Sequence, residues 1–326
     1  MSVYQQIVRT YFFVVTWMSI SMAVIMFNKW ILAYYGFPYP LALTMWHMFF
    51  CSSVAFVLVR VLKVVKSIGM SSKDYQRRVV PIGLLYAASL WLSNSAYLYL
   101  SVSFIQMTKA LMPGLVYMIG CIMGTEVFTP KVTFNMVVIA IGVAIAAYGE
   151  LNFVMIGVVE QLSSLLFEAT RLMLVQVLIN SQGLGMNPIQ SLYYVSPACF
   201  VCLSIPFMAL EFPLISERIE SGSLIVSPYI MLGNAFAAFA LNLAVFLLVG
   251  KTSALTMNIA GVLKDWILIW MSASVFAAPV STLNLVGYFL AFLAVCYYNN
   301  HKLQQMKSRE KANAKDEEEG GKKEDN

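Results

Sequence analysis

Residues 94–108 read NSAYLYLSVSFIQMT, and residues 242–256 read NLAVFLLVGKTSALT. Each stretch begins with an asparagine, continues as an apolar run, breaks for a few residues and returns as a second apolar run. The two stretches lie about 148 residues apart, a separation that holds about five helices of membrane-spanning length. An odd number of helices inverts the second half in the membrane, and carriers built in this way bind their ligand between the halves. These stretches therefore predict an inverted repeat with a site near the middle of the membrane.

Apolar segments of similar length flank both stretches. The chain has 326 residues, of which 60% are hydrophobic and 11% charged, and its mean hydropathy is +0.75. Soluble globular domains of this size do not have such a composition. We therefore predict an all-α integral membrane protein with ten transmembrane helices in two inverted five-helix repeats. The ten predicted spans are residues 11–35, 41–65, 80–100, 102–123, 132–148, 153–179, 188–210, 226–249, 252–276 and 279–298.

The predicted organisation has three parts. Residues 1–149 form the first five-helix repeat and residues 150–301 form the second. Residues 302–326 contain few bulky apolar side chains and end in an acidic and glycine-containing run, so they cannot bury enough surface to fold. We predict that they form a disordered cytosolic tail.

Lysine and arginine residues gather in the loops after the second, fourth and eighth predicted spans and in the tail. By the positive-inside rule, these loops and both termini are expected in the cytosol. The first apolar run begins within about ten residues of Met1, which leaves no room for a transit peptide, so a plastid location is not expected. The basic loop residues are Lys66, Lys73, Arg77, Arg78, Lys131 and Lys251.

Two lysines lie inside predicted spans. Lys109 is about eight residues into the fourth span, and Lys264 is near the middle of the ninth. A cation in hydrocarbon costs about 2.5–3.5 kcal/mol on insertion scales, so it normally faces a cavity and an anionic partner. Lys109 could alternatively extend its ammonium to the membrane surface. We predict that both lysines face an anion-binding cavity.

Asp265 follows Lys264 directly. Consecutive helical residues point about 100° apart, so we do not expect these two side chains to pair. Asp265 is expected either to partner a cation on another helix or to accept hydrogen bonds from substrate hydroxyls. In the sixth span, Glu168 and Arg171 are three residues apart and are expected to form a self-neutralising pair, with a ligand role as the alternative.

Polar and aromatic residues supply further candidates. Ser93, Asn94 and Asn242 could hydrogen-bond between helices as packing contacts, or they could line the cavity of Lys109. Tyr194 could stack on a base, although most aromatic residues in spans are packing residues. Lys29, next to Trp30, is interpreted as an interfacial anchor and only secondarily as a ligand.

Several motifs carry a family resemblance that covers nearly the whole region from the first to the tenth span. The motifs are SLWLSNSAYLYLSVSFIQMTKALMP, VAIAAYGELN, FEATRLMLVQ, NPIQSLYYVSP and ALNLAVFLLVGKTSALTMNIAGVLKDW. They are similar to those of the triose-phosphate translocator and nucleotide-sugar transporter family, within the drug/metabolite transporter superfamily.

The resemblance implies roles for individual residues. Plastid members of the family hold the substrate phosphate with a lysine in span four and a Lys-Arg pair in span nine, which match Lys109 and Lys264, whereas the arginine position is Asp265. A carboxylate at this position lacks the two parallel N–H donors with which an arginine binds a terminal phosphate. The family's polar residue in span three falls on Ser93, and its histidine falls on Leu90. The chain thus resembles a Lys-Asp subgroup of plant homologues, which is similar to Golgi carriers of UDP-arabinofuranose.

These observations lead to an expected function. It is a nucleotide-sugar antiporter of the Golgi membrane that exchanges a UDP-sugar, such as UDP-arabinofuranose, for UMP. The alternative is a sugar phosphate/phosphate translocator. An enzyme is not expected, because the predicted spans contain neither clustered acids for a metal nor HExxH spacing. Nor are a cofactor, a metal ion or a nucleic-acid partner, since the five cysteines all lie inside apolar runs and the basic residues form no single stripe. The expected partners are the lipid bilayer, the anionic substrate and its counter-substrate.

Overall fold

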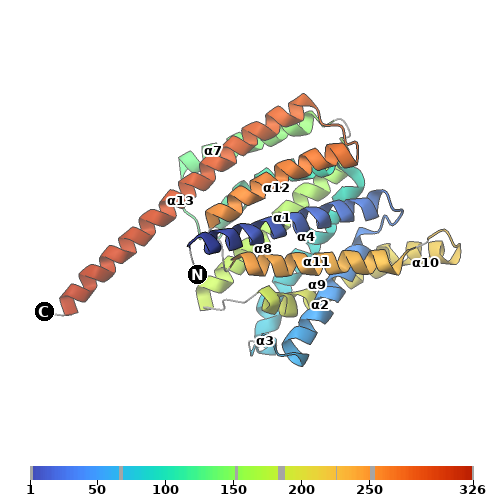
Figure 1. Ribbon diagram of the computed structural model, residues 1–326, viewed down its shortest axis with the longest axis horizontal. Helices are drawn as coiled ribbons and strands as arrows, with labels where there is room; N and C mark the ends of the chain where they lie inside the picture. The colour runs from blue at the N-terminus through green and yellow to red at the C-terminus, as the bar shows by residue number, and fades with distance from the viewer. Residues whose placement is uncertain are drawn as a thin grey trace.

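Helices make up every regular element in the part of the chain that the structure describes (Figure 1). The structure is a computed structural model, and it describes residues 3–65, 69–150, 153–182, 188–224, 226–249 and 254–324. The basic loop residues Lys66 and Lys251, on which the predicted orientation partly depends, lie outside these ranges.

The helices follow one another along the chain with short connections. The first half of the chain contains α1 (Val3–Ala33), α2 (Pro40–Phe56), the π-helical turn η1 (Val57–Val61), α3 (Ser72–Asp74), the π-helical turn η2 (Tyr75–Val79), α4 (Val80–Tyr99), α5 (Val102–Thr108), the 3-10 turn η3 (Lys109–Leu111), α6 (Met112–Ile122) and α7 (Pro130–Tyr148). The second half contains α8 (Met155–Gln182), α9 (Pro188–Leu210), α10 (Phe212–Glu220), α11 (Pro228–Val249), α12 (Ala254–Val275) and α13 (Thr282–Glu324).

Seven helical stretches within the described residues are long and apolar enough to cross a membrane. They are Tyr11–Ala33, Pro40–Val61, Ser72–Tyr99, Val102–Ile122, Pro130–Tyr148, Ile189–Leu210 and Thr282–Lys302. The chain is therefore a multi-pass membrane protein.

The other three predicted spans coincide with α8, α11 and α12, but these helices do not reach the same length and apolarity over their described residues. α8 carries three charged side chains, and α11 supplies only the shorter apolar stretch Pro228–Ala244. Each predicted span overlaps a helix, yet the ten-span topology and the inverted repeat remain predictions.

The most extensive helix contacts join the predicted first repeat to the second. α7 packs along α13, α4 along α8, α2 along α9, and α1 along α11. Figure 1 shows α7 and α13 running side by side at one edge of the molecule. The contact is so close that a Cβ atom on Gly142 would lie only 2.7 Å from the backbone nitrogen of Ala291. Small residues permit such close approach between helices in membranes.

The two predicted repeats are also joined at the N-terminal end of α2, which is the end predicted to face the lumen. Glu211, between α9 and α10, accepts the backbone N–H groups of Leu41 at 2.9 Å and of Ala42 at 2.7 Å. A carboxylate at a helix N-terminus satisfies free backbone donors and matches the helix dipole. Arg218 of α10 donates to the Tyr39 hydroxyl at 3.3 Å and strengthens the same contact.

α13 remains helical to Glu324, where the sequence predicted disorder after Lys302. The residues beyond Lys302 are rich in lysine and glutamate, which favour helix even without tertiary contacts. In Figure 1 this end of α13 projects away from the other helices. The assignment of residues 302–326 to a separate tail remains a prediction.

Candidate functional site

Lys109 lies where the helix of the fourth predicted span is interrupted. α5 ends at Thr108, the chain passes through η3, and α6 begins with Met112 and Pro113. A proline ring clashes with the carbonyl group four residues earlier, which belongs here to Lys109. The interruption therefore follows from Pro113. It places the partly buried Lys109 at a break inside the span, where its ammonium donates to Gln106 Oε1 at 3.3 Å.

Lys264 and Asp265 lie together on α12. Lys264 Nζ is 3.3 Å from Asp265 Oδ1, so the prediction that these neighbours would not pair is wrong. The directions of their Cβ atoms differ, but the four methylene groups of the lysine let its ammonium fold back to the carboxylate. The same ammonium lies 5.8 Å from the centre of the Trp17 ring.

The predicted pair of Glu168 with Arg171 is confirmed. On α8, Arg171 Nε donates to Glu168 Oε2 at 2.9 Å, and Arg171 Nη2 donates to Glu168 Oε1. The guanidinium also lies 4.5 Å from the centre of the Tyr86 ring of α4. These two contacts fix the Arg171 side chain between α8 and α4.

The charged candidates form one group, although they come from three parts of the sequence. The Lys109 ammonium lies close enough to Lys264, Asp265 and Glu168 to interact electrostatically with their charges. We call these residues, together with Arg171, the charged cluster. One buried polar atom beside it, Gln106 Nε2, has no hydrogen-bond partner among the described residues. Such an atom costs about 1–3 kcal/mol when it stays unsatisfied, so it favours a ligand that supplies a partner.

Ser93, Asn94 and Asn242 come together at a different place, a cavity of about 200 Å³. We call it the amide cavity. Asn242 donates to Ala238 of its own helix at 2.9 Å. Lys109 and Lys264 do not belong to the described lining, but Tyr86 does, and its ring contacts Arg171 of the charged cluster. The described lining comprises Val24, Asn28, Thr44, His47, Met48, Cys51, Tyr86, Leu90, Ser93, Asn94, Tyr97, Ala238, Leu241 and Asn242.

A buried chain of hydrogen bonds along the amide cavity connects α1, α2, α4 and α11. His47 Nε2 bonds to Asn234 Oδ1, and Asn234 Nδ2 donates to Asn28 Oδ1 at 2.9 Å. Asn28 Nδ2 donates to Asn94 Oδ1 at 3.2 Å, and Asn94 Nδ2 donates to Thr44 Oγ1 at 2.9 Å. Because each asparagine oxygen here acts as acceptor, His47 carries a proton on Nε2.

Sequence reasoning missed Asn28, Thr44 and His47. The available signal was their polarity inside apolar runs, which favours hydrogen bonds between helices. Their spacing alone does not reveal which helices they join.

Lys29 is not an interfacial anchor, so that interpretation is wrong. It is buried, with 8% of its surface exposed, and its ammonium donates to the carbonyl groups of Tyr97 at 2.6 Å and Leu100 at 3.0 Å. These carbonyls end α4, where a cation stabilises the negative end of the helix dipole. Trp30, by contrast, is 37% exposed.

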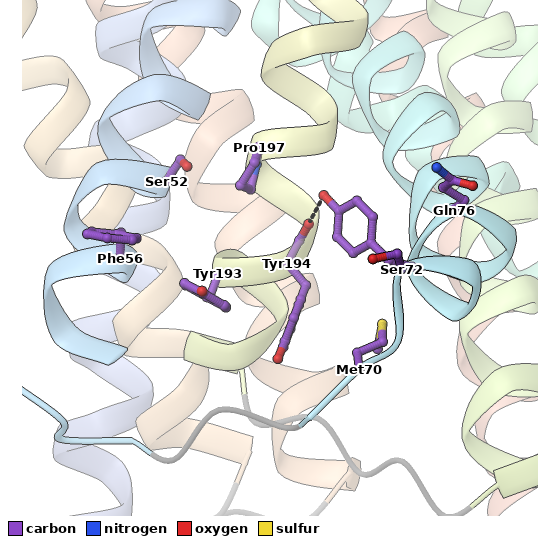
Figure 2. Close-up of a pocket in the computed structure, with 9 residues that line it drawn as sticks. Ser52, Phe56, Met70, Ser72, Gln76, Tyr193, Tyr194 and Pro197 are labelled. Carbon is purple, nitrogen blue, oxygen red and sulfur yellow. Dashed lines mark hydrogen bonds between the residues drawn. The ribbon is translucent and has the colours of Figure 1, made fainter. Parts of the chain in front are cut away.

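Tyr194 lies outside the described lining of the amide cavity. It lines a separate pocket near the start of α9, together with Tyr193 (Figure 2). Its backbone carbonyl accepts a hydrogen bond from the Tyr75 hydroxyl at 2.9 Å, which Figure 2 marks with a dashed line. The structure therefore separates Tyr194 from Ser93, Asn94 and Asn242.

The apolar helices and the polar groups buried among them define a multi-pass membrane protein with an interior polar site. The chain belongs to the Triose-phosphate Transporter family, whose family model matches residues 8–299. The family and the relatives described next are transporters rather than enzymes.

The relatives are plant proteins of similar length. A probable sugar phosphate/phosphate translocator of Arabidopsis thaliana is 53% identical over 94% of this chain and 88% of its own length. Another protein of that description from the same plant is 43% identical over 93% of this chain and 82% of its own length. The GDP-mannose transporter GONST5 of Arabidopsis thaliana is 29% identical over 91% of this chain and 87% of its own length.

Proposed function

We propose that the chain is an endomembrane antiporter that exchanges a nucleotide sugar of the UDP-pentose kind, such as UDP-arabinofuranose, for UMP. The observation that carries the proposal is the position of the charged cluster beside the amide cavity, joined by the contact of Tyr86 with Arg171. A nucleotide sugar has two matching parts, a diphosphate and sugar or nucleoside groups rich in hydroxyls and amides. Lys109 and Lys264 would neutralise the diphosphate, and Asn94 and Asn242 would face the uncharged part.

Asp265 supports a nucleotide sugar over a terminal phosphate. Its carboxylate is paired with Lys264, so it lowers the net positive charge that the cluster offers to an anion. It also occupies the position of the family's arginine, whose guanidinium group would bind a terminal phosphate with two parallel hydrogen bonds. A carboxylate can instead accept hydrogen bonds from ligand hydroxyls, because its two oxygens have more lone pairs than the contact with Lys264 uses.

Obligatory exchange follows from the same charges. Asp265 compensates only one of the two buried ammonium groups, and carrying the remaining positive charge through the membrane without an anion is costly. A bound nucleotide sugar or nucleoside monophosphate would compensate Lys109 and Lys264, so that the two halves could change position around it. The empty carrier would return slowly, and net flow would require an anion in each direction. We place the carrier in the Golgi membrane with both termini in the cytosol.

A second candidate is sugar phosphate/phosphate exchange, which the names of the relatives at 53% and 43% identity favour. The same two lysines would bind the phosphate, and the amide cavity would accept a sugar.

Transport by the purified protein in vesicles tests both candidates. Vesicles are preloaded with UMP, with phosphate or with buffer alone, and uptake is measured for UDP-sugars, GDP-sugars and triose or hexose phosphates. The proposal expects UDP-pentose uptake into UMP-loaded vesicles and none into empty ones. Sugar phosphate uptake into phosphate-loaded vesicles, without nucleotide-sugar uptake, would establish the second candidate instead.

A further inference from the structure

A pocket outside the candidate site lies at the end of α2 opposite Glu211. It has a volume of about 480 Å³ and is formed by Ser52 and Phe56 of α2, Ser72 and Gln76 of the segment before α4, and Tyr193 and Tyr194 of α9. Figure 2 shows Phe56 and Ser52 on one side of the two tyrosines and Ser72 and Gln76 on the other. Its described lining has no residue in common with that of the amide cavity. We call it the α2–α9 pocket.

One edge of the α2–α9 pocket is apolar and faces outward. The Phe56 side chain, which lines the pocket, is 53% exposed. The next turn, η1, also presents exposed apolar side chains, Val57 and Val61. In a multi-pass membrane protein, exposed apolar side chains on a spanning helix face lipid. The pocket therefore opens beside the acyl chains of the bilayer.

The surroundings of the pocket are positively charged. Arg60, Lys63, Lys73 and Arg77 are exposed, and the only acidic residue in the described part of residues 60–78 is Asp74, which pairs with Arg78 at 3.5 Å. The four exposed cations are thus left without a carboxylate from this segment. Clusters of four or more basic residues at the cytosolic end of a membrane helix attract anionic lipid headgroups.

Arg60 connects this charge to the pocket itself. Its Nε donates to the Tyr193 hydroxyl at 2.8 Å, and its guanidinium lies 5.8 Å from the centre of the same ring. Tyr193 lines the pocket, so the guanidinium is held at its rim. Arginine oriented in this way suits a phosphate, because its remaining N–H groups can bind two oxygens together.

We propose that the α2–α9 pocket binds the phosphorylated headgroup of an anionic phospholipid from the cytosolic leaflet. The phosphate would contact Arg60 at the rim, the headgroup hydroxyls would bond to Ser52, Ser72 and Gln76, and the acyl chains would lie along Phe56 and η1. The shared chemistry, a phosphate with hydroxyls, could also belong to a soluble sugar phosphate. The opening beside the lipid-facing Phe56 assigns it to a lipid. The assignment does not depend on the transported substrate.

Native mass spectrometry of the full-length protein tests this assignment. The protein is released from phosphatidylcholine vesicles that contain phosphatidylinositol phosphate, and the retained lipid is measured over a concentration series. Arg60→Gln is expected to weaken binding about fivefold, the typical effect of one basic residue near an anionic lipid. Lys131→Gln is the matched control, because Lys131 is an exposed cation at the start of α7. Arg77→Gln repeats the charge test should Arg60→Gln fail to fold.

A third variant separates the pocket from its charge. Ser72→Tyr fills the pocket without altering any cation, and it is expected to remove the retained lipid. Unchanged retention by Ser72→Tyr, or equal weakening by Arg60→Gln and Lys131→Gln, would mean diffuse attraction to the basic surface and overturn the proposal. Free inositol phosphate is added in a parallel series. If it displaces the lipid at equal concentration, the site recognises a soluble phosphate and the lipid assignment is wrong.

Discussion

The Glu211 carboxylate accepts the backbone N–H of Ala42 at 2.7 Å, across 169 residues of sequence. The contact joins the connection between α9 and α10 to the first turn of α2, and therefore the second predicted repeat to the first. In a carrier whose halves rock against each other, a contact of this kind must break whenever that end opens. Its strength then sets the balance between the two orientations.

The ionisation of Glu211 gives this contact a pH dependence. Burial raises the pKa of the Glu211 carboxyl above its ordinary value of 4.5, although the two backbone N–H groups act in the opposite direction. The folded protein therefore binds the proton more tightly than the unfolded chain does. Its stability relative to an untitratable variant is highest below pH 4.5 and falls as the pH rises through the folded-state pKa.

The prediction concerns the difference in melting temperature between the native protein and Glu211→Gln in detergent. The melting temperature of the native protein is expected to fall relative to that of Glu211→Gln as the pH rises from about 4 to 8. This is the range in which a carboxyl group with a raised pKa loses its proton. Thermal unfolding of both proteins across that range measures it. A difference that grows with pH would mean that the carboxyl pKa is lowered in the folded state.

Removal of either cluster lysine is expected to abolish exchange. Lys109→Ala and Lys264→Ala each delete a charge-assisted contact of about 1.5–3 kcal/mol, which corresponds to a loss of at least tenfold in exchange rate. Initial uptake rates in preloaded vesicles provide the measurement, with expression and gel filtration as checks on folding. Lys131→Ala, an exposed lysine, is the control and should retain full activity. Normal uptake by either cluster variant would show that the lysine has only a structural role.

Asp265→Arg is expected to change the preference between ligands. It replaces the partner of Lys264 by a cation and restores a guanidinium fork, so nucleotide-sugar exchange should fall and binding of phosphate or triose phosphate should rise. Both substrates are measured in the same vesicles. Asp265→Asn, which removes the charge without adding the fork, separates the two effects. Unchanged nucleotide-sugar exchange in Asp265→Arg would mean that Asp265 does not contribute to specificity.

The buried asparagine chain is expected to stabilise the packing of α11 against α1 and α2. Asn234 is fully buried and bonds to both Asn28 and His47, so Asn234→Ala should cost about 1–3 kcal/mol, measured as a lower melting temperature. Asn242→Ala is the contrasting variant, because Asn242 donates only within its own helix among the described contacts. It should leave the melting temperature nearly unchanged and reduce exchange. Equal destabilisation by both variants would contradict this division of roles.

Limited proteolysis of sealed vesicles tests the predicted topology. The tail after Lys302 should be removed by added protease in right-side-out endomembrane vesicles, since both termini are predicted in the cytosol. A tag at the N-terminus should be removed under the same conditions. Protection of either end would contradict an even number of spans with cytosolic termini.

Local chemistry made part of the site predictable. Lys109 and Lys264 stand out because a cation in an apolar run requires compensation, and the pairing of Glu168 with Arg171 follows from their spacing on one helix. The same spacing rule failed for Lys264 and Asp265, because it considers where Cβ atoms point and neglects the reach of a lysine side chain.

Contacts between distant helices could not be predicted. Lys29 binds the carbonyl groups that end α4, and those partners are backbone groups without any sequence signature. Asn28 and Asn234 are 206 residues apart, and only the packing of α1 along α11 brings them together. The helices themselves were predictable from apolar run lengths, whereas their neighbours in space were not.

The close approach of α7 and α13 has a consequence for the moving parts of the carrier. Because no methyl group fits between Gly142 and the backbone of Ala291, and because Asn135 and Asn284 bond across the same contact, these two helices cannot slide without losing several interactions together. They form a rigid helix pair that contains the last helix of each predicted half. The two predicted halves are then expected to stay together along this edge and to open about the α7–α13 pair as a hinge.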